Sequence, residues 1–340
     1  MSHVVWFNKN FSSLYNIIQL IKAEDTGKVF RILCTHENPE FVGFEVCDLR
    51  EVETISADEP YIHYCLEMCQ KHKVSIFYPS KKTTTIARNL DLFEAIGVKT
   101  IICADAPTLD VLNHKGHFYD ALAGENALLP QYYAVNTLAK FDEACECIKQ
   151  TGKTICFKPA RSLYGLGFKV ISDHIRAVDA FLAGDPNRIA LGDARTQFAS
   201  IDRFQDVLVM EYLEGPEYSI DCLAKNSRLV RATVRKKSMR AGGPELLEKN
   251  DDLYDLAQKL TAKFHLTGIF NIQARCGDGV PKLLEINPRM AGGIYFSCLA
   301  GINYPYWALR MATEDCETEI PTQRFGLRVH QAYQPFVIKE

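Results

Sequence analysis

The feature that most constrains the fold is a pair of polar-patterned segments near the end of the chain, joined by a Cys-Gly-Asp-Gly turn at 276–279. Side chains alternate between two faces in an extended chain, so Asn271 and Gln273 share one face of the first segment. Glu285 and Asn287 share one face of the second segment. The turn residues favour an antiparallel hairpin. Four oxygen-bearing side chains can therefore converge on this hairpin.

The chemistry of these side chains indicates a metal site. Carboxylate and carboxamide oxygens are ligands that Mg²⁺ prefers, and the ion also keeps waters and binds phosphate oxygens of its substrate. Arg289, two residues after Asn287, offers a planar guanidinium to a phosphate or a carboxylate. The alternative is a polar strand face in solvent that ends at Pro288 and two glycines. The combination of residues favours the metal site.

A second polar region lies upstream, where an apolar strand at 154–160 carries one lysine, Lys158. The loop that follows contains Gly165 and Gly167, which let the backbone fold closely over an anion and present N–H groups to it. Each signal alone is weak, because a strand lysine often extends its charge to solvent and Gly-x-Gly is common in turns. Together they allow a loop that folds closely over an anion next to Lys158.

The hairpin motif, Asn-x-Gln on one strand and Glu-x-Asn-Pro-Arg on the next, resembles the metal-binding end of the ATP-grasp superfamily. The resemblance is strongest to the branch of carbamoyl-phosphate-synthetase-like enzymes and carboxylate–amine ligases. It implies that Gln273, Glu285 and Asn287 bind one or two Mg²⁺ ions, or Mn²⁺ in their place, which bridge the phosphates of ATP. Arg289 would steady the transferred phosphoryl group. Size and layout are also similar to ATP-grasp proteins of tellurite-resistance type stress-response operons in bacteria.

The same resemblance assigns the nucleotide site. Lys115, before a helix predicted at 117–122, and Lys158 would contact the phosphates, and the loop would cover them. After the buried strand at 207–210, Glu211 would accept from the adenine amino group, the next two backbone units would bind the ring edge, and Glu217 would hold the ribose. The alternative for 211–217 is an acidic turn in solvent. The nucleotide-binding residues implied are Lys115, Lys158, Tyr164, Gly165, Gly167, Glu211, Tyr212, Leu213 and Glu217.

A group of cations, Arg235, Lys236, Lys237 and Arg240, precedes two glycines between the hinge and the hairpin. They could clamp an anionic carboxylate substrate or a developing acyl phosphate. Equally, they could form a solvated strand face and loop. Arg235 is favoured as a catalytic residue because it alternates with Thr233 and Lys237 on one face.

Residues 1–105 alternate short apolar runs with amphipathic stretches, a rhythm that predicts βαβ units and a parallel sheet. We expect strands at 4–7, 29–34, 75–78 and 100–103 and helices at 11–21 and 61–71. The fold class is α/β, or α+β overall, with a Rossmann-like lobe that resembles the pre-ATP-grasp lobe. The expected lobes are residues 1–105, a small lid subdomain with the phosphate loop at 106–213, and a large subdomain with the Mg-binding strands at 214–340.

Composition narrows the class of protein. The net charge of −3 over 340 residues suggests neither a nucleic-acid nor an anionic-membrane partner. No run of eighteen apolar residues and no signal-peptide pattern is found, which favours a cytoplasmic protein. The twelve cysteines include no Cys-x-x-Cys pair and lie mainly in apolar segments, as expected of free thiols in a reducing compartment. The absence of Gly-x-x-x-x-Gly-Lys-[Ser/Thr] argues against a P-loop enzyme.

These observations predict an ATP-dependent, ADP-forming carboxylate–amine ligase that works through an acyl phosphate. Its partners would be a small-molecule carboxylate and an amine, with a homodimer left open. One alternative is an enzyme like the biotin-dependent carboxylases or one that forms carbamoyl phosphate. Another is a non-catalytic nucleotide-binding regulatory module, which would not need the three metal-binding residues together with Arg289.

Overall fold

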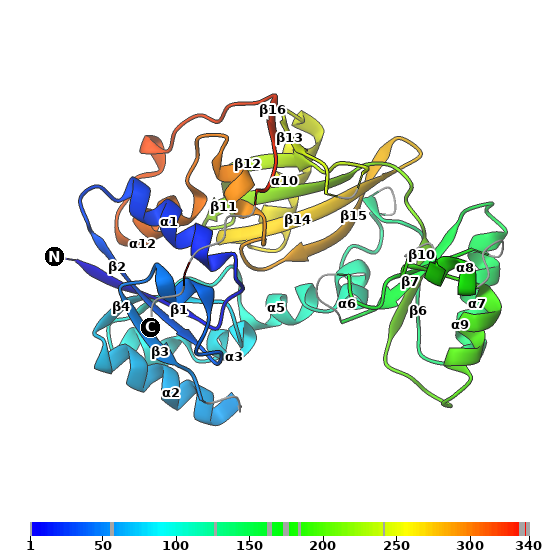
Figure 1. Cartoon of the computed structure of the whole chain (residues 1–340), viewed down its shortest axis with the longest axis horizontal. Helices are drawn as coiled ribbons and strands as arrows, with labels where there is room; N and C mark the ends of the chain where they lie inside the picture. Colours follow the sequence, from blue (N-terminus) through cyan, green and yellow to red (C-terminus); the bar gives the residue numbers. More distant parts are fainter. Residues whose placement is uncertain are drawn as a thin grey trace. The chain divides into compact units, whose positions relative to one another are not determined.

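The computed structural model describes residues 2–54, 58–125, 128–161, 165–172, 177–182, 185–240, 242–332 and 337. The chain forms two compact units (Figure 1). The first unit gathers three separate segments, and the second unit gathers two. The first unit comprises Met1–Asp110, Glu217–Gln273 and Ile286–Glu340, and the second comprises Val111–Pro216 and Ala274–Glu285.

The first unit begins with a five-stranded sheet of order β3-β2-β1-β4-β5. Every neighbouring pair in it is parallel, which confirms the predicted parallel sheet. Its central strand, β1, is buried over its last four residues because apolar side chains there meet helices on both faces. The strands are β1 (His3–Asn8), β2 (Phe30–His36), β3 (Leu49–Val52), β4 (Val74–Pro79) and β5 (Lys99–Thr100); the helices are α1 (Leu14–Glu24), α2 (Asp58–Lys71), α3 (Thr83–Ala87), α4 (Leu90–Ala95) and α5 (Ala106–Leu112), with a 3-10 turn, η1 (Val42–Glu45).

Three details differ from the sequence prediction. Strand β3 was not expected, because its Leu-Arg-Glu-Val sequence alternates half-buried and exposed residues at the edge of the sheet. The strand expected at 100–103 forms ladder pairs only at Lys99 and Thr100. Helix α1 begins at Leu14 because residues 11–13 form a turn, in which the Leu14 N–H donates to the Phe11 carbonyl.

The second unit is built on a sheet of order β6-β10-β7-β8-β9, with β10 antiparallel to both of its neighbours. Helices α7 and α9 cover one face of it (Figure 1), where Phe141, Phe157 and Phe198 pack together. Its elements are α6 (Lys115–Asp120), β6 (Tyr132–Val135), α7 (Leu138–Lys149), β7 (Ile155–Pro159), β8 (Lys169–Ile171), α8 (Ala177–Leu182), β9 (Arg188–Ile189), α9 (Leu191–Phe198) and β10 (Val207–Glu211).

A six-stranded sheet of order β15-β14-β11-β12-β13-β16 forms the rest of the chain's framework. Asp278 and Gly279 both have positive φ, at 52° and 80°, so the predicted hairpin closes with a two-residue turn of the type that suits strand twist. Its elements are β11 (Glu217–Lys225), β12 (Arg228–Lys236), β13 (Glu245–Glu248), α10 (Asp251–Lys263), β14 (Gly268–Gly277), β15 (Val280–Asn287), α11 (Ile294–Cys298), α12 (Tyr304–Thr313), η3 (Glu317–Glu319) and β16 (Leu327–Val329).

The core of the first unit joins distant parts of the sequence. Helix α12 lies against α1, and the Asn303 side chain donates to the Leu20 carbonyl at 2.7 Å. Val5 and Trp307 belong to one buried cluster. Among the described residues, no helix combines the length and the apolar character that crossing a membrane requires.

Candidate functional site

Two of the predicted site residues are in contact in the second unit, and a third, Lys158, lies on a strand whose end is bonded to one of them. The ammonium of Lys115 lies 3.2 Å from the Glu285 carboxylate. The Lys115 N–H donates to the carbonyl of Ala160, just beyond β7. This hydrogen bond holds the start of α6 next to the strand that carries Lys158. Both lysines are buried, with 9% of each residue exposed. Burying two cations is costly unless anions are close, so this arrangement suits the binding of a polyanion.

Helix α6 begins two residues earlier than the sequence predicted, at Lys115 instead of His117. The reason is that His114 acts as the N-cap: its ring nitrogen Nδ1 accepts from the His117 N–H at 3.2 Å. The hydroxyl of Tyr119 on the same helix donates to the carbonyls of Leu283 and Leu284 at 3.2 and 3.1 Å. Lys115 is therefore held beside the strand that carries Glu285.

The hinge after β10 is tied to its surroundings by backbone bonds. The Tyr212 N–H donates to the Thr154 carbonyl at 2.7 Å, and Leu213 is buried. The buried Glu211 carboxylate accepts from the Gln131 N–H at 3.0 Å and forms an ion pair with Lys282, both through Oε1. The Glu211 side chain is thus engaged by the protein. The adenine contacts expected for Glu211, Tyr212 and Leu213 stay predictions.

The tip of the hairpin packs on this hinge within the second unit. The Gly215 N–H donates to the Cys276 carbonyl at 2.9 Å, and a Cβ at Gly215 would lie 2.6 Å from the Cys276 Cβ. Arg275 stacks over the Tyr212 ring at 4.9 Å and donates to the Tyr212 hydroxyl at 3.1 Å. Glycine at 215 is therefore required by the close approach of two backbones.

The loop after β7 contains two glycines in the left-handed region, Gly165 at φ 68° and Gly167 at φ 79°. A Cβ at Gly167 would lie 2.8 Å from two ring carbons of Pro159, the residue after Lys158. A Cβ at Gly165 would meet none of the described residues within 4 Å. Gly167 therefore lets the loop lie directly on the end of β7. The predicted site residue Tyr164 lies outside the described residues.

The hairpin places the three predicted metal ligands on neighbouring strands, Gln273 on β14 and Glu285 and Asn287 on β15, and each is half-buried. Asn271, the fourth side chain of the expected convergence, lies two residues before Gln273 on β14. It is fully buried, and its amide donates to the Ser219 hydroxyl at 2.9 Å and to the Asp221 carboxylate at 2.8 Å. Alternation along the strand does not tell which neighbour a buried amide will bond.

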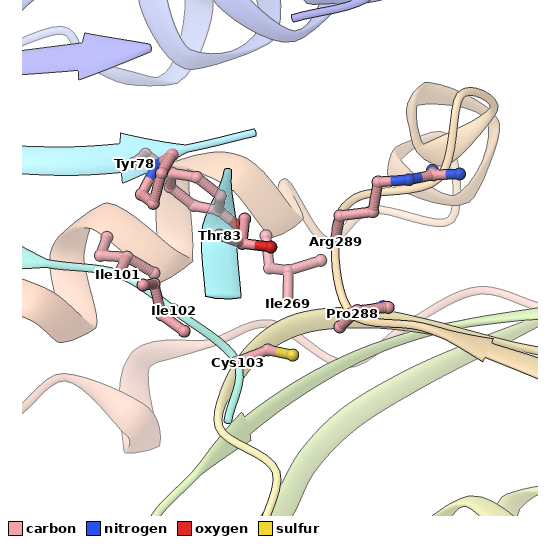
Figure 2. A pocket seen from close by; sticks show the side chains of 9 residues that line it. Tyr78, Thr83, Ile101, Ile102, Cys103, Ile269, Pro288 and Arg289 are labelled. Carbon is pink, nitrogen blue, oxygen red and sulfur yellow. The ribbon is translucent and has the colours of Figure 1, made fainter. Parts of the chain in front are cut away.

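Arg289 lies next to the end of β15, where its Nη2 donates to Asn287 Oδ1 at 3.2 Å. Its guanidinium also lies 5.3 Å from the centre of the Phe11 ring. Figure 2 shows Arg289 beside a small pocket in the first unit, opposite Tyr78 and Thr83. A predicted metal ligand and the predicted phosphoryl-binding arginine are thus in direct contact.

Glu217, the expected ribose ligand, begins β11 in the first unit. Its carboxylate forms an ion pair with Lys237, and its carbonyl accepts from the Lys237 N–H at 2.8 Å. Lys236 lies over the Tyr218 ring at 5.9 Å, and Arg240 is exposed. Of the four cations at 235–240, Lys237 therefore pairs with Glu217, which is itself a predicted site residue.

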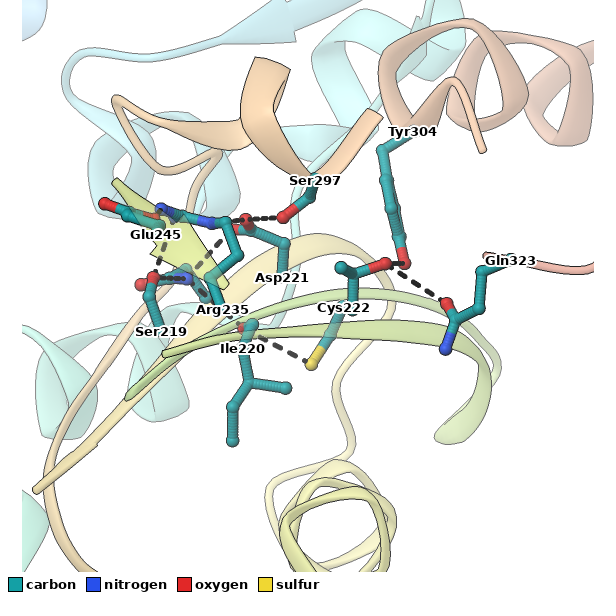
Figure 3. Close-up of polar contacts among 11 residues, drawn as sticks. Ser219, Ile220, Asp221, Cys222, Arg235, Glu245, Ser297, Tyr304 and Gln323 are labelled. Atoms are coloured by element: carbon teal, nitrogen blue, oxygen red, sulfur yellow. Dashed lines mark hydrogen bonds and ion pairs between the residues drawn. The ribbon is translucent and has the colours of Figure 1, made fainter. Parts of the chain in front are cut away.

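Arg235 points into the protein and not to solvent, with only 3% of it exposed. Figure 3 shows its guanidinium between three partners. It donates to the Asp221 carboxylate and to the Ser219 hydroxyl, both at 2.9 Å, and to the Glu245 carboxylate. Its charge is therefore balanced inside the first unit, and its expected catalytic role stays a prediction.

The residues present fit Mg²⁺ and ATP. In the described part of the chain, no group of three or more His, Cys, Asp or Glu side chains is arranged so that it could hold a metal ion. The hairpin offers one carboxylate and two carboxamides, hard oxygen donors that suit an ion taking its other ligands from phosphates and water. The ion pair between Lys115 and Glu285 brings a cation predicted to bind phosphate close to a carboxylate predicted to bind metal. The ion pair between Lys282 and Glu211 could not be predicted from the sequence, because the two residues are far apart along the chain and belong to no common motif.

Comparisons with known proteins find one matching family model and several similar sequences. Residues 203–335 match the model of a family described as ATP-grasp in the biosynthetic pathway with Ter operon. The chain is 21% identical over 300 residues to the arginine-specific carbamoyl phosphate synthase large chain of Bacillus subtilis, and 20% identical over 274 residues to the large chain of Clostridium acetobutylicum. These matches cover 82% and 76% of the chain but only 26% and 24% of the relatives' length.

Similar solved structures confirm the predicted fold. An N5-carboxyaminoimidazole ribonucleotide synthetase bound to ADP matches with TM-score 0.65 and 12% identity, covering 96% of this chain and 79% of that one. An L-amino acid ligase from Bacillus licheniformis matches with TM-score 0.63 and 13% identity, covering 92% and 74%. The biotin carboxylase domain of the Hydrogenobacter thermophilus 2-oxoglutarate carboxylase, solved with MgADP and bicarbonate, matches with TM-score 0.62 and 14% identity, covering 93% and 70%.

Proposed function

We propose that this chain, which belongs to the ATP-grasp superfamily in its carbamoyl-phosphate-synthase-like branch, is an ATP-dependent, ADP-forming ligase that joins a carboxylate to an amine. The observation that carries the proposal is the contact between buried Lys115 and Glu285 beside β7. It brings a phosphate-binding cation and a metal-binding carboxylate together in the order along the chain that the superfamily motif implies.

In the proposed reaction, the substrate carboxylate attacks the γ-phosphorus of ATP, and ADP leaves. An amine then attacks the carbonyl carbon of the acyl phosphate, forming the C–N bond and releasing phosphate. Bound Mg²⁺–ATP supplies the phosphoryl group and neutralises part of its charge. The chain's own share is positioning and charge stabilisation, because phosphoryl transfer needs little covalent help from protein groups.

The roles proposed for the residues are those that the resemblance to the superfamily implies. Lys115 and Lys158 would hold the phosphates, and Gly165 and Gly167 would let backbone N–H groups approach them. Gln273, Glu285 and Asn287 would hold one or two Mg²⁺ ions. Arg289, held by Asn287, would stabilise the phosphoryl group as it moves. We propose that the lobes 1–105, 106–213 and 214–340 carry the acceptor, the phosphate loop and the metal strands.

A carboxylase is the second candidate, favoured by the likeness to the biotin carboxylase domain solved with bicarbonate. The two candidates differ in what makes ATP turnover proceed. A carboxylase would release ADP only when bicarbonate is present. A carboxylate–amine ligase would do so when an acid and an amine are present, without bicarbonate.

The test is ADP release by the purified chain with Mg²⁺–ATP across pools of acids and amines, with and without bicarbonate. Hydroxylamine added with an active acid would trap an acyl phosphate as the hydroxamate. Glu285→Gln, which keeps the side-chain size, serves as the matched inactive control. ADP release that needs only bicarbonate, or no binding of Mg²⁺–ATP at all, would overturn the ligase proposal.

A further inference from the structure

The carboxyl edge of the N-terminal sheet has the topology of a ligand site. In the order β3-β2-β1-β4-β5, the chain moves from β1 to β2 on one side and returns to β4 on the other. The loops after β1 and β4 therefore diverge at a switch point, where open parallel sheets bind their ligands. Both loops are rich in cations and amides: Asn8, Lys9 and Asn10 follow or end β1, and Ser80, Lys81 and Lys82 follow β4.

One buried side chain locks these loops together. Asn8 is fully buried, and its Oδ1 accepts from the Ser80 N–H at 2.7 Å. Its Nδ2 donates to the Tyr61 hydroxyl at 2.6 Å and to the Lys81 carbonyl at 3.3 Å. Asn10 adds a bond from its amide to the Ser80 hydroxyl at 2.6 Å. The two loops thus form one preorganised surface.

The backbone of these loops is strained where the lysines are. Lys9 has φ 28° and Lys82 has φ 58°, in the left-handed region that side-chain-bearing residues avoid. Such conformations persist where surrounding contacts enforce them, and they are common at ligand sites. Here the Lys9 N–H is held by the Thr35 carbonyl at 2.7 Å.

The edge carries an excess of positive charge at close range. Burial and the nearby Lys81 lower the pKa of Lys9 to about 8, with Glu53 opposing the effect. Burial also lowers the pKa of His36, and the two lysines lower it further. Lys9 forms an ion pair with the exposed Glu37, but in the described part of the chain Lys81 forms none with a carboxylate.

Glu53 is the remaining anion at this edge. It is buried, its Oε2 accepts from the Thr35 hydroxyl at 3.2 Å, and Oε1 has no hydrogen-bond partner among the described residues. Burial raises the pKa of this carboxyl group. The charge of Glu53 acts to raise the pKa of Lys9, which favours the protonated form of that lysine.

The edge also adjoins the predicted phosphoryl-binding residue. Phe11, which follows Asn10, packs against the Arg289 guanidinium at 5.3 Å. Pro79 and Thr83, on either side of the lysines in the second loop, line the same pocket as Arg289. Figure 2 shows Thr83 and Arg289 in this pocket. A molecule on the lysines would thus lie next to the place where the carboxylate is proposed to be activated.

We propose that the loops after β1 and β4 bind an anionic group of the acceptor substrate, a carboxylate or a phosphate, through Lys9 and Lys81. The substrate would then be a molecule with two ends, an anionic end on the lysines and a reacting end near Arg289. The identification of the bound molecule as the acceptor substrate rests on the proposed function. The inference that these loops bind an anion depends only on the structure of the loops.

The test is calorimetric titration of the full chain with inorganic phosphate and, separately, with succinate. Lys9→Met and Lys81→Met should each weaken binding about tenfold or more, the effect of losing a charge-assisted hydrogen bond. Lys73→Met is the matched control, because Lys73 is exposed, also has positive φ, and lies before β4 at the opposite edge. It should change the dissociation constants less than twofold.

Lys158→Met separates this site from the nucleotide site, since it should leave succinate binding unchanged. The anion that binds more tightly indicates which group the substrate carries. Tighter binding of phosphate indicates a phosphorylated acceptor, and tighter binding of succinate indicates a dicarboxylate. Wild-type succinate and phosphate binding in Lys81→Met, or no binding of either anion at millimolar concentration, would overturn the proposal. A parallel titration with Mg²⁺–ATP keeps the outcomes distinct, because a failure there removes the ligase function and not the anion site.

Discussion

Replacing Arg235 by methionine should destabilise the first unit severely, because it leaves a buried carboxylate without its cation. Asp221 is fully buried, and Arg235 is its only charged partner among the described residues. The amide of Asn271 at 2.8 Å and the hydroxyl of Ser297 at 2.6 Å would remain as neutral donors. Methionine keeps much of the side chain's length, so the main loss is the charge and not the volume.

The expected loss is about 3–5 kcal/mol, the usual cost of removing one partner of a buried ion pair. Glu245 adds little to this cost because its side chain is 18% exposed and can regain water. Against a stability of about 5–15 kcal/mol for a typical protein, the loss is large. Lys236→Met on the same strand is the control: its ammonium lies 5.9 Å from the Tyr218 ring, and losing such a contact costs about 0.5–1 kcal/mol.

Urea unfolding followed by tryptophan fluorescence measures the effect in the right place, since the two tryptophans, Trp6 and Trp307, both lie in the first unit. Asp221→Asn combined with Arg235→Met should recover part of the loss, because the orphaned charge is removed with its partner. Equal stability losses in Arg235→Met and Lys236→Met would refute the reasoning. A variant that stays as stable as wild type but loses turnover would instead support a direct catalytic role for Arg235.

Three further predictions concern the candidate site. Glu285→Gln should keep the fold and lower nucleotide-dependent turnover about a hundredfold or more, as measured by ADP release at saturating Mg²⁺, since it removes the one carboxylate of the metal set; wild-type turnover would exclude this residue. Lys158→Ala should weaken Mg²⁺–ATP binding by titration, whereas Arg289→Ala should depress turnover more than binding, and the reverse pattern would exchange their roles. Gly167→Ala should lower the melting temperature and the Mg²⁺–ATP affinity more than Gly165→Ala, because both have positive φ but, among the described residues, only a Cβ at Gly167 meets a neighbour within 4 Å; equal effects would show that the close contact is unimportant.

The sequence was sufficient for features that depend on local pattern. The parallel N-terminal sheet follows from apolar runs alternating with amphipathic helices, and the hairpin follows from Asp278 and Gly279, whose preference for positive φ is intrinsic. The family motif predicts the metal ligands, because its spacing places Glu285 and Asn287 on one face of the strand. These features depend on the local sequence and not on which residues pack against them from other strands.

Features that depend on distant partners could not be predicted. Arg235 reads as a cation on an alternating strand, and only the folded sheet shows that its face meets Asp221. Glu211 reads as a candidate for adenine, and only the fold brings Lys282 to it. The lysines after β1 and β4 are separated by more than seventy residues, so the sequence of one loop does not predict its contact with the other.

The division of the first unit among three segments has a consequence for how the chain folds during synthesis. The buried cluster of that unit needs both Val5, from the first strand, and Trp307, from near the other end of the sequence. The buried residues of the second unit's cluster lie between 135 and 209. Since chains emerge from the ribosome in order, the second unit can close its core first, while the apolar face of the N-terminal sheet still awaits its covering helix. That interval is when α1 and β1 are most exposed to aggregation and chaperones.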